Sequence, residues 1–199
     1  DRADQLPGLC GQIRRQVLKR ALGSSADPAA LYDALLGANC WNMLYFDLSL
    51  QDRVAGAIAD NVSWLDFTHG LTFANAVRVQ CTKFPELWPA GLLQMGCFVG
   101  RNAGFVDGGQ DVSRWRVSDG TAFLERQQRA LFDHAQPEHI VSCHLVKLLT
   151  ALADELAATR PDAPPAQRRA GGSEPLPAQA AETQTSGPHG ATSPRSGRR

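Results

Sequence analysis

The sequence lacks any apolar run long enough to cross a lipid bilayer, which takes about 20 residues as a helix. Its most apolar stretch, residues 90–106, is interrupted by Gln94, Arg101 and Asn102. The first residues also lack the basic and apolar regions of a secretory signal peptide. We therefore expect a cytoplasmic protein without a membrane partner.

Paired cysteine motifs are also missing. The five cysteines are an odd number and show no Cys-x-x-Cys spacing. Most have apolar neighbours in helical segments, where a reduced cysteine packs as a small hydrophobic side chain. This pattern excludes a disulfide scaffold and fits a reducing compartment. The chain begins at Asp1 rather than at a methionine, which leaves open whether it is a piece of a longer protein.

Large apolar side chains are scarce in residues 160–199. This segment holds seven of the twelve prolines, and Leu176 is its one large aliphatic residue. It cannot bury enough apolar surface to offset the entropy of ordering it, so we predict a disordered tail behind a folded domain at residues 1–159. The tail carries a net charge of +3 and the domain −3. Because the domain lacks clustered positive charge, we expect no nucleic-acid partner.

Period-two alternation over strand length is absent, whereas apolar residues recur at helical spacing. The pattern predicts helices over residues 9–22, 28–37, 49–84 with a break near Asn61, 86–106, 119–135 and 137–158. Residues 40–48 are ambiguous between helix and loop. Capping residues support several of the starts: Asp27, Ser49, Ser63, Asp119 and Pro137. We therefore predict a single all-α domain of six to seven helices.

Three glycines, Gly96, Gly100 and Gly104, recur at every fourth position and so share one helix face. Each weakens a helix by about 1 kcal/mol relative to alanine, so the stripe needs a reason. Either another helix comes close, in this chain or in a second copy, or a planar ligand lies flat against the stripe. Packing is the favoured interpretation, and helix–helix self-association is one form of it.

Two histidines are expected to point inward from different helices. His69 lies in mid-helix among bulky apolar residues, and His144 shares a face with Ile140 and Leu148. Lys147 lies nearly one turn beyond His144. A buried neutral imidazole needs a partner for its donor nitrogen and for its acceptor nitrogen. The two rings are therefore expected to bond each other, backbone carbonyls or a shared metal, although a satisfied core histidine is the commoner case.

Several catalytic motifs are absent. HExxH, paired ExxH and GxxxxGK[ST] do not occur, which argues against a zinc protease, a di-iron bundle and a P-loop. Cys143 adjoins His144, but adjacent helical residues point about 100° apart and do not form a nucleophile–base pair. Asp66, three residues before His69, is placed to orient that imidazole. The segment 107–119 is predicted to be a loop, long enough to act as a lid.

Residues 66–78, Asp-Phe-Thr-His-Gly-Leu-Thr-Phe-Ala-Asn-Ala-Val-Arg, and the later His144-Leu-Val-Lys147 together resemble a known helical region. That region follows an N-terminal Rieske-type iron–sulfur domain in some bacterial proteins. It is similar in turn to the questin oxidase-like family, which is associated with oxidation of polyketide-type rings. The match covers about residues 64–102 and 140–152. It implies a site at His69 and His144, with Asn75 and Lys147 beside them.

The Rieske ligand patterns Cys-x-His and Cys-x-x-His do not occur in this chain. The resemblance therefore places any [2Fe–2S] cluster upstream of Asp1, and iron is the metal it implies.

These features together predict a helical oxidoreductase-type domain with a small-molecule pocket between the His69 and His144 helices. In this hypothesis His69, His144 and Lys147 act on the substrate, or the two histidines bind a metal. The alternative is a non-catalytic structural or interaction module whose histidines are structural. The first hypothesis requires the two imidazoles within several ångströms of each other beside a cavity. The second requires them apart, or individually hydrogen-bonded with no cavity.

Overall fold

The computed structural model describes residues 27–51, 61–133 and 137–159. The helix predicted over residues 9–22, the segment 52–60 and the predicted tail, 160–199, lie outside these ranges. The described residues form five α-helices and several short 3-10 turns, and their one β-type contact is an isolated bridge between Phe46 and Val106. The all-α fold class is confirmed for this part of the chain. Across the same ranges, no helix combines the length and the apolar character needed to span a bilayer.

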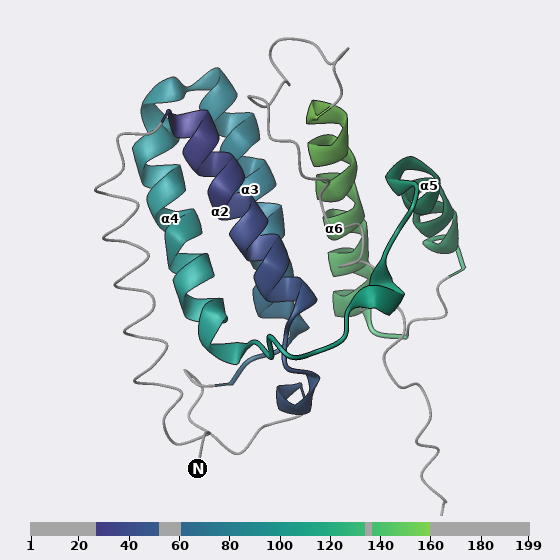
Figure 1. Ribbon diagram of the computed structural model, residues 1–199. Helices are drawn as coiled ribbons and strands as arrows, with labels where there is room; N and C mark the ends of the chain where they lie inside the picture. Colours follow the sequence, from purple (N-terminus) through teal and green to yellow (C-terminus); the bar gives the residue numbers. More distant parts are fainter. Residues whose placement is uncertain (1–26, 52–60, 134–136, 160–199) are drawn as a thin grey trace, which may run out of the picture.

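The helix α3 (Trp64–Lys83) lies at the centre of the arrangement (Figure 1). It contacts α2 (Pro28–Leu44), α4 (Trp88–Asn102) and α6 (His139–Ala158), while the short α5 (Gly120–Ala130) packs on α6. The main core fills the space between these helices, and its largest fully buried apolar side chains are Tyr32, Phe67, Phe123, Leu36, Met95 and Leu148. The position of α3 between α4 and α6 places its residues at two helix interfaces.

Three predicted helix starts are confirmed, each by a side chain that accepts an amide hydrogen of the first turn. Asp27 accepts from the Ala29 amide of α2 at 3.1 Å, and Asp119 accepts from the Ala122 amide of α5 at 3.0 Å. At α3, Ser63 and Asp66 form a reciprocal capping box. These caps satisfy amides that a helix start would otherwise leave without partners.

Other predicted boundaries were wrong. The helix α2 continues through Gly37 to Leu44, because Asn39, Cys40 and Met43 bury its next turns against the core. Burial of those turns outweighs the roughly 1 kcal/mol that a glycine costs inside a helix. Ser49 lies within a 3-10 turn (Leu48–Leu50) that Asp47 caps. In addition, α5 ends at Ala130, and α6 begins at His139 rather than at the predicted proline, residue 137.

Glycines permit close helix contacts at two places that the pattern of the sequence did not indicate. A Cβ atom added to Gly91 of α4 would lie 2.7 Å from Cγ1 of Val77 in α3. One added to Gly70 of α3 would lie 2.8 Å from Oδ1 of Asn39 in α2. The predicted stripe residues Gly96, Gly100 and Gly104 are all buried, and α2 donates the Asn42 side-chain amide to the Val99 carbonyl of α4 at 3.0 Å. Burial of the three glycines favours the packing interpretation. Gly104, however, lies in the 3-10 turn Ala103–Phe105 that follows α4, so the predicted stripe does not continue along one helix to that residue.

The substitution Gly91→Ala should lower the free energy of unfolding by about 1–2 kcal/mol, although alanine is the better helix former. The branched Val77 side chain has little freedom to move away from an added methyl group. Gly37→Ala is the matched control, because no atom lies within 4 Å of its added Cβ; it should raise stability by about 0.5–1 kcal/mol. Urea denaturation of both variants measures the difference. Equal stabilisation by the two alanines would contradict the tight α3–α4 contact.

A buried ion pair joins α3 to α6. Nε of Arg78 lies 2.7 Å from Oε1 of Glu155, and the side chains are 8% and 3% exposed. The same carboxylate oxygen accepts the Asn75 side-chain amide at 3.0 Å, and Nη2 of Arg78 donates to the Asp154 carbonyl at 3.3 Å. Because these bonds are directional, they set the position of α6 along α3 and hence which of their other side chains meet.

Candidate functional site

The imidazoles of His69 and His144 meet where α3 and α6 face each other. Their Nε2 atoms are 3.0 Å apart and their ring centroids 5.1 Å apart. The Trp64 ring stands edge-on to His144 at 5.9 Å. Each histidine therefore has the other histidine as a hydrogen-bond partner, which is one of the partners predicted for these rings.

The hydrogen bonds define the tautomers of the neutral pair. Nδ1 of His144 lies 2.7 Å from the Ile140 carbonyl oxygen, which can only accept, so this nitrogen carries the hydrogen. Nε2 of His144 is then an acceptor, and Nε2–H of His69 donates to it. The remaining ring nitrogen, Nδ1 of His69, carries a lone pair and has no hydrogen-bond partner among the residues described. It is the one nitrogen of the pair that is available to accept a proton.

The pKa of His69 is lowered from its ordinary value of 6.5. Burial of the ring is the largest cause, because it penalises the charged form, and electrostatic interactions with the Lys147 ammonium and with His144 act in the same direction. The negative charge of Asp66 raises the pKa by a smaller amount. His69 is therefore a neutral base at physiological pH.

Asp66 does not orient His69 as expected. Its Oδ2 accepts the Ser63 backbone amide at 2.9 Å, and its Oδ1 lies 3.0 Å from the Arg101 guanidinium. The capping position at the first turn of α3 directs the carboxylate toward the helix start and α4. Its influence on His69 is limited to electrostatic attraction.

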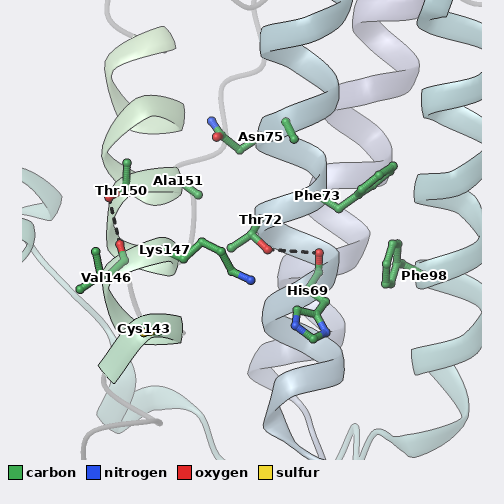
Figure 2. A pocket seen from close by; sticks show the side chains of 11 residues that line it. His69, Thr72, Phe73, Asn75, Phe98, Cys143, Val146, Lys147, Thr150 and Ala151 are labelled. Atoms are coloured by element: carbon green, nitrogen blue, oxygen red, sulfur yellow. Dashed lines mark hydrogen bonds between the residues drawn. The ribbon is translucent and has the colours of Figure 1, made fainter. Parts of the chain in front are cut away.

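A groove of about 700 Å³ opens beside the histidine pair. Its lining side chains come from α3, α4 and α6: His69, Thr72, Phe73, Asn75, Ala76, Phe98, Cys143, Val146, Lys147, Thr150 and Ala151. Figure 2 shows Lys147 extending from α6 toward α3, on the side of His69. The groove has the size of a small-molecule site and the usual mixture of mainly apolar walls with a few polar groups.

The predicted neighbours Asn75 and Lys147 both line the groove, whereas the loop at residues 107–119 contributes no lining side chain. Its expected role as a lid is therefore not supported. Phe73 and Phe98, which were not among the predicted site residues, form an apolar wall with ring centroids 5.5 Å apart. Phe73 lies four residues after His69 and could have been identified from helical spacing. Phe98 belongs to α4, and only the folded structure places it opposite Phe73.

The metal predicted at His69 and His144 has weak support from the geometry. Tetrahedral zinc with ligands at about 2.0–2.1 Å would hold two nitrogens roughly 3.4 Å apart, whereas 3.0 Å is a hydrogen-bond length. No cluster of three metal-binding side chains occurs among the described residues. The proposed chemistry of this histidine pair therefore involves no metal ion.

Elemental analysis of the purified chain should accordingly find iron and zinc far below one atom per chain. Iron or zinc near one per chain, lost in both His69→Ala and His144→Ala, would instead establish a shared metal site.

No protein-family model, curated protein or solved structure matches this chain. The resemblance carried by residues 66–78 and 144–147 therefore stays a prediction. Arguments about function rest on the histidine pair and the groove beside it.

Stability should fall as the pH is lowered below neutrality, because the pKa of His69 is lower in the folded protein than in the unfolded chain. The unfolded chain binds a proton near pH 6.5, whereas folded His69 resists protonation until its own lower pKa is reached. The loss of stability therefore begins at about pH 6.5 and levels off below the pKa of His69 in the folded protein. Urea denaturation between pH 5 and 8 tests this, with His69→Gln as the comparison. An unchanged pH profile in His69→Gln would contradict the assignment to this ring.

Proposed function

We propose that this chain is a helical oxidoreductase-type domain that binds a small molecule in the groove between α3 and α6. In this proposal Nδ1 of His69 accepts a proton from the bound molecule. The observation that carries it is the His69–His144 pair, with Nε2 atoms 3.0 Å apart beside a groove of about 700 Å³. This is the juxtaposition that the oxidoreductase hypothesis requires.

The pair is arranged to hold a proton on His69. When Nδ1 becomes protonated, the Nε2–H of the resulting imidazolium still donates to Nε2 of His144, and that bond strengthens because the donor is charged. The Ile140 carbonyl keeps His144 in the required tautomer through its bond to Nδ1. General bases of this kind typically contribute about 10²–10⁴-fold to a rate.

Oxidation of a hydroxyl group needs a base, because the oxygen loses its proton as electrons leave the molecule. His69 would act as that base and take the O–H proton of a bound alcohol. The carbon-bound hydrogen would leave with both bonding electrons, as a hydride, to a two-electron acceptor from outside the described residues, the role that the added dye has in the assay below.

The non-catalytic helical module remains the second candidate, and one observation favours it. Both ring nitrogens of His144 are hydrogen-bonded within the protein. The histidine pair therefore ties α6 to α3 as the Arg78–Glu155 pair does. On this reading the substitution of either histidine costs stability, and the groove has no ligand.

The two candidates are separated by titrating the full chain with benzyl alcohol and following backbone amides by NMR. The proposed function predicts shifts at His69, Thr72 and Lys147, together with reduction of an added dye acceptor that falls about 100-fold or more in His69→Gln. The pH profile of that reduction should rise through the pKa of His69. If no lining residue shifts and His69→Gln only loses stability, the structural module is the correct candidate.

A further inference from the structure

Lys147 places a positive charge in the groove, and no acidic side chain of the described ranges forms an ion pair with it. Its ammonium extends toward α3 on the side of His69 (Figure 2), and its charge contributes to the low pKa of that ring. The ion pairs found within the described residues join Arg78 to Glu155, Arg101 to Asp66 and Arg129 to Glu125. None of them includes Lys147.

Two acidic side chains that interact with residues of the groove, Asp66 with His69 and Glu155 with Asn75, are already engaged. Asp66 pairs with Arg101 at 3.0 Å, and Glu155 accepts from Arg78 at 2.7 Å and from Asn75 at 3.0 Å. Each carboxylate is thereby held by an arginine. A negative charge for Lys147 is more readily supplied by a ligand than by rearrangement of these pairs.

The other polar groups that line the groove have donor hydrogens directed elsewhere. The hydroxyls of Thr72 and Thr150 donate to carbonyls of their own helices, and the Asn75 amide donates to Glu155. Nε2–H of His69 is directed at His144. Apart from the second Asn75 amide hydrogen and the weak Cys143 thiol, Lys147 is therefore the donor that the lining residues leave for a bound molecule, and it is the charged one.

Apolar side chains make up the rest of the lining. Phe73 and Phe98 lie with ring planes 42° apart, and Val146 and Ala151 lie on the α6 side. Phe73 and Phe98 can contact an apolar part of a ligand, and the Lys147 ammonium can pair with one negative charge. A phosphate, with more charge and more acceptor oxygens, is typically bound by arginine forks or by several donors.

Building on the proposed function, we propose that the ligand of this groove is a small organic carboxylate with an apolar body. The carboxylate pairs with the Lys147 ammonium, and the body lies against Phe73 and Phe98. His69 lines the same groove, and its Nδ1 is the nitrogen that we assign to act on a group of the ligand. The proposal assigns substrate selection to Lys147 and proton transfer to His69.

A bound carboxylate would also change the protonation of His69. The titratable groups that act on that ring are Lys147 and His144 on α6 and Asp66 on α3. A carboxylate on Lys147 offsets the ammonium charge and so favours the imidazolium. Binding near pH 6 should therefore take up protons, and affinity should fall as the pH rises through the pKa of His69 in the complex.

The test uses the full chain and a matched pair of probes, 4-phenylbutyrate and the uncharged 4-phenylbutanamide. The acid should shift the backbone N–H signals of residues that line the groove. The uncharged 4-phenylbutanamide should bind about fivefold more weakly, because an ion pair with an exposed lysine contributes at most about 1 kcal/mol. Lys147→Met should weaken binding of the acid by a similar factor. Lys83→Met is the matched control, because it removes the same charge from the exposed end of α3, and it should leave affinity within about twofold. Calorimetry in phosphate and in bis-Tris at pH 6 should give different binding enthalpies, as proton uptake requires, and His69→Gln should remove the difference.

Two outcomes would overturn the inference in different ways. Equal binding of acid and amide probes, unaffected by Lys147→Met, would exclude a carboxylate-selective site and leave the groove as a small-molecule site. Shifts outside the groove, or none with either probe, would count against the carboxylate inference, and the benzyl alcohol titration would then decide whether the groove binds any ligand.

Discussion

Replacing Phe123 by alanine should lower the free energy of unfolding by about 3–5 kcal/mol. The Phe123 side chain is 0% exposed, and Phe123 and Leu124 are the only buried residues of α5. The helix is 11 residues long and packs on α6, too short to be stable in water on its own. Phe123→Ala therefore loses the free energy gained by burying the ring. It also removes the main apolar contact that holds α5 against α6.

Phe132→Ala is the matched control, because the same side chain just beyond α5 is 93% exposed. It should change stability by no more than about 0.5 kcal/mol. Urea denaturation measures both variants, and amide hydrogen exchange shows whether the loss is local. If α5 detaches by itself, its amides alone lose protection and the global loss is smaller than expected. Equal stability of the two variants would show that α5 is not held by Phe123.

Helix starts could be predicted because a cap is local chemistry. Asp27, Ser63 and Asp119 each accept an amide hydrogen two or three residues ahead, so a short stretch of sequence contains the whole interaction. The error at Gly37 has the opposite cause. Gly37 resembles a helix end, but the residues after it continue as helix because α3 and α4 cover them, and no short stretch of sequence contains that contact.

The histidine pair was partly predictable. Apolar neighbours on α3 and α6 indicated that His69 and His144 point inward, and their Nε2 atoms lie 3.0 Å apart in the structure. The groove wall was not predictable, because Phe98 belongs to a third helix whose position depends on close contacts at Gly91 and Gly70.

Arg78 and Glu155 were missed although the sequence held a signal for each. Glu155 continues the buried stripe of Leu148, Ala151 and Leu152, and Arg78 continues a similar stripe on α3. A charged residue on an apolar helical stripe needs a partner of opposite charge. The partner lies 77 residues away in the sequence, so helical periodicity alone cannot identify it.

Glu155→Leu should therefore destabilise the protein by about 3–5 kcal/mol, because it leaves the Arg78 guanidinium buried without its carboxylate. The Asn75 side-chain amide loses its acceptor at the same time. Glu125→Leu is the matched control: that carboxylate lies 3.9 Å from Arg129 on the surface of α5, where a salt bridge contributes about 0–1 kcal/mol. Denaturation in urea compares the two. If Glu155→Leu lowers the free energy of unfolding as little as Glu125→Leu does, the Arg78–Glu155 pair is not shielded from water.

The double variant Arg78→Met/Glu155→Leu separates the cost of an unpaired charge from the net value of the pair. Two well-packed apolar side chains commonly replace a buried ion pair at little cost, and in some proteins with a gain of about 1–4 kcal/mol. We therefore expect the double variant to recover most of the stability that Glu155→Leu loses.

Because Asn75 lines the groove and donates to Glu155, binding of 4-phenylbutyrate to the double variant then shows whether the groove needs the pair. Restored stability with weakened binding would mean that the pair sets the position of α6, and thus of Lys147, against α3. Restored stability with unchanged binding would mean that apolar packing between α3 and α6 is sufficient to hold the site.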